Sequence, residues 1–223
     1  EIAVIDSEKR KIDIETFRNE LGEFSVDRLM LERGNIDAPI DPDYDLSPYK
    51  AIYIRVGEVT AGVLDRAENL EIVSTCGSGY DHIDVEAATE RGGLVAHTPN
   101  APAPGAVEHT IGFIFTLLND FPEMFERTAN GQWSEGQEVV EELHDRTIGV
   151  VGLGTIGLEV ARIAKNAFNA DVIAHDPYVS GEKQSDIYPR VPRNEIESAG
   201  ITLVGQEEVF ELASMVTMHV PLT

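Results

Sequence analysis

Residues 147–165, TIGVVGLGTIGLEVARIAK, carry the pattern G-x-G-x-x-G at Gly152, Gly154 and Gly157. A lone match of this pattern is weak, so its context decides: a strand before it, a helix through its third glycine, and an acidic residue about 20 positions on. The run TIGVVG is β-branched and apolar on both faces, which is typical of a central strand in a parallel sheet. The segment after it has the apolar periodicity of a helix face, formed by Ile156, Val160, Ile163 and Ala164.

The acidic residue is Asp176, which ends the run ADVIAHD and lies 19 positions after Gly157. A carboxylate there accepts hydrogen bonds from both hydroxyls of an adenine ribose and repels a 2′-phosphate. The stretch is therefore interpreted as a dinucleotide-binding turn, rather than glycines that serve tight packing alone. Neither Pro177 nor Tyr178 is basic, which favours NAD over NADP. Three residues nearby leave NADP open: His175, Arg190 and Arg193.

The composition is that of a globular chain large enough to build its own core. It has 223 residues, of which 42% are hydrophobic and 26% charged. Its single cysteine, Cys76, excludes an internal disulfide and a cysteine-based metal cluster, and this fits a reducing compartment. The opening residues show no signal-peptide pattern. We therefore expect a cytoplasmic protein without a metal site.

The charge is strongly acidic, with 17 Lys and Arg against 40 Asp and Glu and a formal net charge of −23. No excess of basic residues is present to neutralise phosphates, so binding to nucleic acid is not expected. Proteins of salt-adapted organisms use such a high net charge. We interpret the chain as halophilic, with an acidic protein from a moderate environment as the alternative.

Short apolar or β-branched runs alternate with helix-like segments along the chain, which indicates an α/β fold with mostly parallel sheets. The predicted strands are 2–5, 51–55, 71–75, 94–97, 147–152, 171–175 and 215–220. The predicted crossover helices are VLDRAENL, VEAATERG and EEVFELAS, at 63–70, 85–92 and 207–214.

A proline-rich segment interrupts this alternation, with Pro99, Pro102 and Pro104 within six residues. We place the domain boundary there, between residues 1–99 and 100–223, and expect a helix just after Pro104. That helix contains AVEHTIGFIFTLL, which is apolar on several sides but too short to span a membrane. It must be buried in a core or against another subunit, and we expect a homodimer.

Several motifs resemble one family in the same order. They are GSGYDHIDVEAATERGGLVAHTPNAPAPGAVEHTIGFI, GQW, the glycine stretch, HDP and HVPLT. Together they resemble the NAD-dependent D-2-hydroxyacid dehydrogenases, most closely those similar to D-3-phosphoglycerate dehydrogenase. The match runs from about Ile52 to Thr223.

The resemblance implies two doubly wound parallel-sheet domains: a flavodoxin-like substrate domain, completed by the chain's end, and a Rossmann cofactor domain. The implied substrate-binding residues are Arg55, Val56, Gly57, Cys76, Gly77, Ser78 and Gly79, with backbone N–H groups of the CGSG loop meeting the substrate carboxylate. Thr110 is implied near the nicotinamide, and His219, Val220 and Pro221 beside the adenosine. The glycine turn adds Gly152, Gly154, Thr155, Ile156, Gly157 and Asp176.

The sequence departs from the family at its end. The family's catalytic arginine, glutamate and histidine follow the HVPLT motif, and the sequence ends at Thr223. We therefore assign no catalytic residue and expect the C-terminal part of the cofactor domain to be missing. The expected function is interconversion of a small D-2-hydroxy acid and its 2-keto acid with NAD(H). The alternative is a complete, non-catalytic NAD-binding module.

Three residue assignments in the first domain have plainer alternatives. Cys76 has no basic neighbour that would lower its thiol pKa, which favours a packed side chain over a reactive thiol. Asp81, His82 and Asp84 resemble a metal cluster, but capping of a helix that begins at Val85 is the preferred interpretation. Arg55 is equally consistent with a substrate contact and with a surface ion pair.

Salt dependence tests the halophilic interpretation. The Debye length falls from about 10 Å at 0.1 M salt to about 3 Å at 1 M, so salt should relieve repulsion among the carboxylates. Between about 0.1 and about 3 M KCl, we expect the melting temperature of the wild type to rise more than that of a variant with four substitutions to Gln. The substituted residues are Glu135, Glu138, Glu141 and Glu142. Equal gains in both proteins would leave the acidity unrelated to salt.

Overall fold

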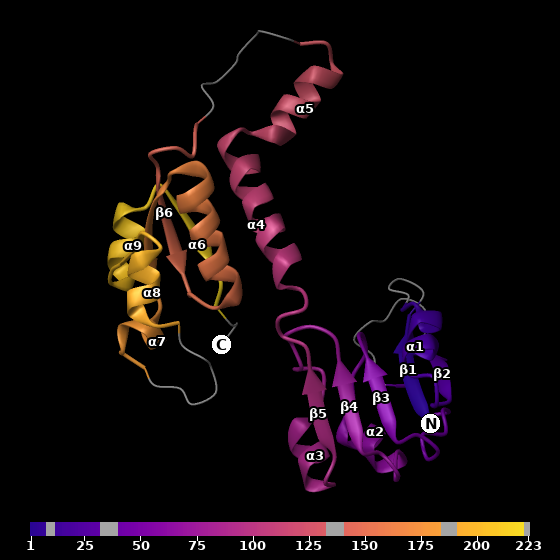
Figure 1. The fold of residues 1–223 in the computed structure, drawn as a ribbon. Coiled ribbons are helices and arrows are strands. Elements are labelled where there is room, and N and C mark those ends of the chain that lie inside the picture. Colours follow the sequence, from indigo (N-terminus) through magenta and orange to yellow (C-terminus); the bar gives the residue numbers. More distant parts are fainter. Residues whose placement is uncertain (8–11, 32–39, 133–140, 184–190, 221–223) are drawn as a thin grey trace. The chain divides into compact units, whose positions relative to one another are not determined.

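The structure is a computed structural model that describes residues 1–7, 12–31, 40–132, 141–183 and 191–220 (Figure 1). The chain forms two compact units, Glu1–Pro102 and Ala103–Thr223. The division lies inside the proline-rich segment. The substrate and cofactor roles expected for the two units stay predictions.

The first unit contains one five-stranded parallel sheet in the order β2-β1-β3-β4-β5. This is the flavodoxin-like order, with a switch point between β1 and β3. The strands are β1 (Ile2–Asp6), β2 (Val26–Met30), β3 (Ala51–Ile54), β4 (Ile72–Thr75) and β5 (Leu94–His97). The helices are α1 (Ile14–Glu20), α2 (Ala61–Arg66) and α3 (Val85–Glu90).

Helices cover both faces of this sheet. Its strands carry apolar side chains at consecutive positions, so each face contributes to a core. Ile5 and Ile54 belong to the core that α2 and α3 cover, together with Val63 of α2. Val4, between Ala3 and Ile5 in the same strand, packs on the opposite side with Ile14 of α1. Side chains of a strand alternate between faces, so β1 contributes to both cores.

The second unit has a parallel sheet in the order β8-β7-β6-β9. The first strand of this unit, β6, lies between its second strand, β7, and its fourth, β9. This is the strand order of the first half of a Rossmann fold. The strands are β6 (Thr147–Val151), β7 (Asp171–His175), β8 (Ile201–Leu203) and β9 (Met215–Met218).

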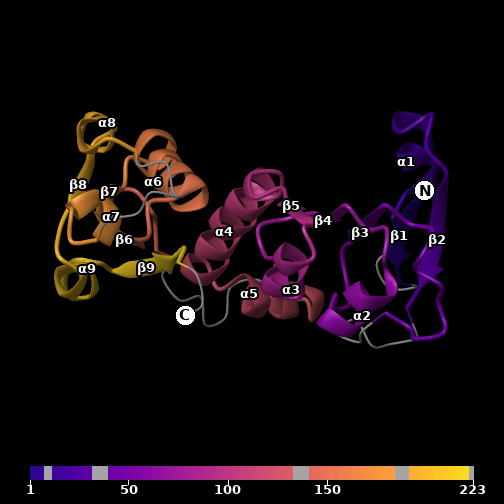
Figure 2. The same ribbon diagram turned by 90° about the horizontal axis from the view of Figure 1, so that it is seen from below.

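Helices cover both faces of the second sheet. Helix α6 (Thr155–Phe168) lies on one face and α9 (Gln206–Leu212) on the other (Figures 1 and 2). Helix α4 (Ala103–Leu118) packs against α6. The remaining helices are α5 (Phe121–Ala129), α7 (Pro177–Ser180) and α8 (Arg193–Ser198). No helix among the described residues is long and apolar enough to cross a membrane.

The predicted α/β class with parallel sheets is confirmed, and all seven predicted strands are present with ends within two residues. Two strands were not predicted. β2 reads VDRLM, with two charged residues, and β8 has only three residues. The helix expected after Pro104 begins at Ala103 instead, because the first turn of a helix tolerates proline.

Candidate functional site

The glycine turn after β6 brings three segments of the second unit into close contact. Gly152 has φ +92°, and a Cβ there would lie 2.5 Å from the carbonyl oxygen of His219. A Cβ on Gly157 would lie 2.0 Å from the carbonyl oxygen of Gly152. Side chains at either position would push α6 or the segment after β9 away from the turn, so both glycines are required by packing.

Gly154 differs from the other two glycines because a Cβ there would meet no atom of the described residues within 4 Å. It is the N-cap residue of α6, and it supplies no side chain to cap the helix. The first N–H groups of a helix have no partner within the helix, and they form a natural site for an anion. Ile156, by contrast, packs against the core. The open space therefore lies at Gly154, at the amino end of α6.

Hydrogen bonds connect the carboxyl ends of neighbouring strands at this turn. The N–H of Gly152 donates to the carbonyl of His175 over 2.8 Å, and the N–H of His219 donates to the carbonyl of Val151 over 2.8 Å. The ends of β6, β7 and β9 thus meet at the point where the strand order reverses. Ligands of open α/β sheets bind in this position.

Asp176 has a structural role that the sequence did not reveal. Its Oδ2 accepts from the N–H of Leu153, inside the glycine turn, over 2.8 Å. Its Oδ1 accepts from the N–H groups of Tyr178 and Val179 at the start of α7. A carboxylate has about four acceptor positions, so it still has capacity for a ribose hydroxyl. Asp176 fixes the turn as well as lying beside the open helix end.

The other predicted cofactor residues have varied surroundings. His219 lies 3.0 Å from Thr217 between Nε2 and Oγ1, and burial lowers the pKa of His219, which favours the neutral imidazole. Val220 is exposed beside Gly152. Thr110 donates its hydroxyl to the carbonyl of Ala106 within α4. Thr155 is the first residue of α6. Pro221 lies outside the described residues.

In the first unit, Arg55, Val56 and Gly57 directly follow β3. Val56 is buried, and Gly57 turns the chain with φ +95°. Arg55 is exposed and has no ion pair or hydrogen bond with any described residue, so the surface ion pair considered for it is not formed there. Its guanidinium is therefore available to a ligand carboxylate.

The CGSG loop, Cys76 to Gly79, follows the neighbouring strand β4. Gly77 has φ +108°, and its N–H donates to Oγ1 of Thr98 over 3.0 Å, so this donor is already used within the protein. Within the described part of the chain, the N–H groups of Ser78 and Gly79 have no partner. The N–H groups of Ser78 and Gly79 are therefore open to a ligand, whereas that of Gly77 is not.

Cys76 and the residues around His82 support the packed loop. Burial raises the pKa of Tyr53, and the thiol of Cys76 raises it further. Nε2 of His82 lies 3.3 Å from Oγ1 of Thr75, and burial lowers the pKa of His82. Asp84 accepts from the N–H of Ala87 and caps α3, as predicted. The described residues contain no group of three His, Cys, Asp or Glu side chains placed to hold a metal.

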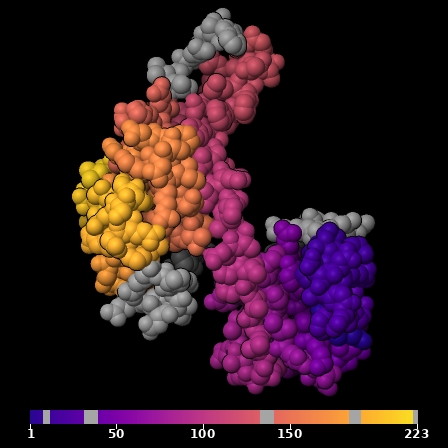
Figure 3. All heavy atoms as spheres, viewed as in Figure 1, coloured from indigo at the N-terminus to yellow at the C-terminus, as the bar shows by residue number. Residues whose placement is uncertain are grey.

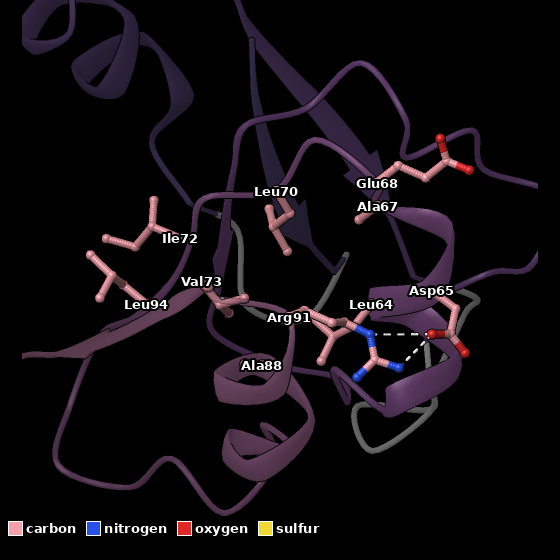
Figure 4. Close-up of a pocket in the computed structure, with 11 residues that line it drawn as sticks. Leu64, Asp65, Ala67, Glu68, Leu70, Ile72, Val73, Ala88, Arg91 and Leu94 are labelled. Carbon is pink, nitrogen blue, oxygen red and sulfur yellow. Dashed lines mark hydrogen bonds and ion pairs between the residues drawn. The ribbon is translucent and has the colours of Figure 1, made fainter.

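A separate cavity of about 370 Å³ lies near the amino ends of β4 and β5 (Figure 4). Leu64, Leu70 and Leu94 line it, and Arg91 and Asp65 form an ion pair at its rim. The CGSG loop follows the carboxyl end of β4. The cavity therefore lies at the opposite ends of the strands from the CGSG loop and is separate from it.

The fold and these loops define a class: an α/β protein with an uncapped helix end at a topological switch point. The family model for the catalytic domain of D-isomer specific 2-hydroxyacid dehydrogenases matches residues 3–219. The chain belongs to this family, and the resemblance seen in the sequence is confirmed at that level.

Relatives support the same assignment. The D-3-phosphoglycerate dehydrogenase of Methanocaldococcus jannaschii is 36% identical over 174 residues, which cover 77% of this chain and 31% of that protein. This chain thus spans about a third of that relative's length.

Two solved structures share the fold. D-lactate dehydrogenase from Aquifex aeolicus, crystallised with NAD and lactic acid, has a TM-score of 0.77 and 24% identity, covering all of this chain and 61% of that one. An acyclic imino acid reductase in complex with NADPH and D-Arg has a TM-score of 0.72 and 19% identity, covering all of this chain and 66% of that one.

Two alanine substitutions in the glycine turn should distinguish the glycine that close packing requires from the glycine that lies beside open space. Gly157→Ala should lower the free energy of unfolding by about 1–3 kcal/mol, because its Cβ overlaps the carbonyl of Gly152. Gly154→Ala, whose Cβ would meet no described atom within 4 Å, should cost less than about 1 kcal/mol. Urea unfolding followed by circular dichroism measures both. Equal losses would mean that the turn does not approach α6 as described.

Proposed function

We propose that this chain is part of an enzyme that interconverts a D-2-hydroxy acid and its 2-keto acid with NAD(H). The observation that carries the proposal is the uncapped amino end of α6 at Gly154, with the Asp176 carboxylate tied to the same turn. A dinucleotide joins an anionic diphosphate to a ribose, and it needs both an anion site and a hydroxyl acceptor.

The open helix end suits the diphosphate. A 14-residue helix places partial positive charge at its first N–H groups, and the missing side chain at Gly154 lets phosphate oxygens approach the backbone. Gly152 and Gly157 hold the helix close to the strand, so the N–H groups are preorganised. When bound, NAD(H) supplies or accepts the hydride at C2 of the acid.

The loops of the first unit suit the acid. Arg55 presents a guanidinium without a partner among the described residues, and Ser78 and Gly79 present two backbone N–H donors. Carboxylates are bound by such pairs of charged and backbone donors. The group on C3 of the acid, which sets specificity, would be chosen by side chains other than these.

A substitution of Asp176 tests the preference for NAD over NADP. Its charge should oppose the 2′-phosphate of NADP, so Asp176→Asn should lower the ratio of the NADP dissociation constant to that of NAD by about tenfold, or 1.4 kcal/mol. Asparagine keeps a side-chain oxygen that can cap α7, so the variant should fold normally. Calorimetric titration with both cofactors measures the ratio.

An Asp176→Ala variant controls for the structural role of the carboxylate. It should weaken NAD binding further than Asp176→Asn does, because α7 loses its cap in addition to the loss of the Leu153 acceptor, and the turn loosens. A ratio that stays constant in both variants would show that Asp176 does not discriminate the cofactors. NAD binding without any turnover of 2-keto acids by the natural gene product would favour the non-catalytic module.

We also propose a homodimer formed through α4. One face of this helix, including Ile114 and Phe115, packs on the core of the second unit. The opposite face leaves Phe113 57% and Leu117 72% exposed, and Phe125 of α5 is 69% exposed. Figure 3 shows much of α5 uncovered in that view. An apolar surface of this kind marks an interface.

Light scattering in molar salt should give twice the 24.4 kDa of one chain. Changing both Phe113 and Leu117 to Glu should give monomers, since four carboxylates per dimer would be buried without partners. The matched control is Phe24→Glu, an equally exposed aromatic residue of the first unit, which should stay dimeric. A wild-type monomer would contradict the proposal.

A further inference from the structure

The pairing of β4 with β5 changes where the CGSG loop begins. The last paired residues are Thr75 and His97, so a regular ladder would next place Cys76 opposite Thr98. Instead Gly77 meets Thr98: its N–H donates to Oγ1 of Thr98 over 3.0 Å, and its carbonyl accepts from the N–H of Thr98 over 3.1 Å. The regular ladder therefore ends at Thr75 and His97, and beyond it Thr98 contacts Gly77 through two hydrogen bonds.

The residues after β5 also hold the next part of the loop. Nδ1 of His97 lies 3.2 Å from the carbonyl oxygen of Ser78, and because a carbonyl only accepts, this nitrogen carries the hydrogen. The hydroxyl of Ser78 donates to the carbonyl of Pro99 over 3.0 Å. The ring of Tyr80 meets the ring of His97 edge-on. Residues 97–99, which we call the clasp, thus hold the CGSG loop in place through these contacts.

These contacts fix the direction of the two N–H groups that remain. In a planar trans peptide, the carbonyl of one residue and the N–H of the next point in opposite directions. The carbonyl of Gly77 points to Thr98, so the N–H of Ser78 points away from it. The carbonyl of Ser78 points to His97, so the N–H of Gly79 also points away from the clasp. Neither N–H has a partner in the described ranges.

We propose that Thr98 and His97 are positioning residues, which turn the Ser78 and Gly79 N–H groups toward the carboxylate of the acid. This inference rests on the proposed function. Successive backbone donors form a concavity for anions, and a loop held before binding loses less entropy when the anion arrives. Thr98 uses its side chain and its backbone on one glycine, so its hydroxyl is the most direct point at which to test the clasp.

The experiment uses the natural gene product that carries this sequence, saturated with NAD⁺. The probes are pyruvate, 2-ketobutyrate and 2-ketovalerate, which have no hydrogen on C2 and therefore cannot give a hydride to NAD⁺. Thr98→Val keeps the shape of the side chain and removes the acceptor, and Thr98→Ser restores it. Thr89→Val is the matched control, because Thr89 donates its hydroxyl to Val85 inside α3, away from the loop.

We expect Thr98→Val to raise the dissociation constant of the tightest keto acid about three- to tenfold, the effect of one neutral hydrogen bond. The dissociation constant of NAD⁺ should stay within about twofold, and Thr98→Ser and Thr89→Val should match the wild type. In ¹⁵N-glycine and ¹⁵N-serine labelled protein, the Gly79 and Ser78 amide signals should shift on saturation with the acid.

A second variant covers the case that Thr98→Val does not fold. His97→Phe keeps an aromatic ring against Tyr80 but removes the Nδ1 hydrogen, and it should also weaken acid binding with NAD⁺ affinity unchanged. Unchanged acid affinity in a folded Thr98 or His97 variant would overturn the positioning role and leave the proposed function intact. A wild-type protein that binds NAD⁺ but none of the three acids would instead overturn the proposed function, and this inference with it.

Discussion

The close approach of α6 to the end of β6 is the constraint on which the rest of the second unit depends. A Cβ on Gly157 would lie 2.0 Å from the Gly152 carbonyl oxygen, so the helix begins directly against the turn. That contact places the first N–H groups of α6 at the carboxyl ends of the strands. Gly152 in turn allows the segment with His219 to approach. Gly152 and Gly157 allow the close packing, and Gly154 leaves space at the amino end of α6.

Hydrogen bonds then fix what packing brings together. Asp176 links the turn after β6 to the start of α7 through Leu153 and Tyr178. In the first unit, Thr98 links the loop after β4 to the end of β5 through Gly77. In both places a polar side chain from one strand end holds the backbone of the neighbouring loop. The backbone donors are thus set before any ligand binds, which lowers the entropic cost of binding.

Much of this arrangement was predictable from the sequence. The spacing of the glycines and Asp176 predicted the turn, and the apolar runs predicted seven of the strands. The strands β2 and β8 were missed because one is charged and the other is short. The bonds from Asp176 to Leu153 and from Thr98 to Gly77 join residues 23 and 21 positions apart, and no local pattern encodes them. Use of the Gly77 N–H by Thr98 depends on the path of the chain beyond the last pair of the β4–β5 ladder, which only the structure reveals.

The central claim is that the amino end of α6 at Gly154 receives the diphosphate of NAD. The most direct measurement is a crystal structure of the protein with NAD⁺. The account predicts phosphate oxygens against the backbone of Gly154 and Thr155, with an adenine ribose hydroxyl on the Asp176 carboxylate and the Leu153 bond retained. NAD⁺ bound elsewhere on the second unit, with water alone at the helix end, would contradict it.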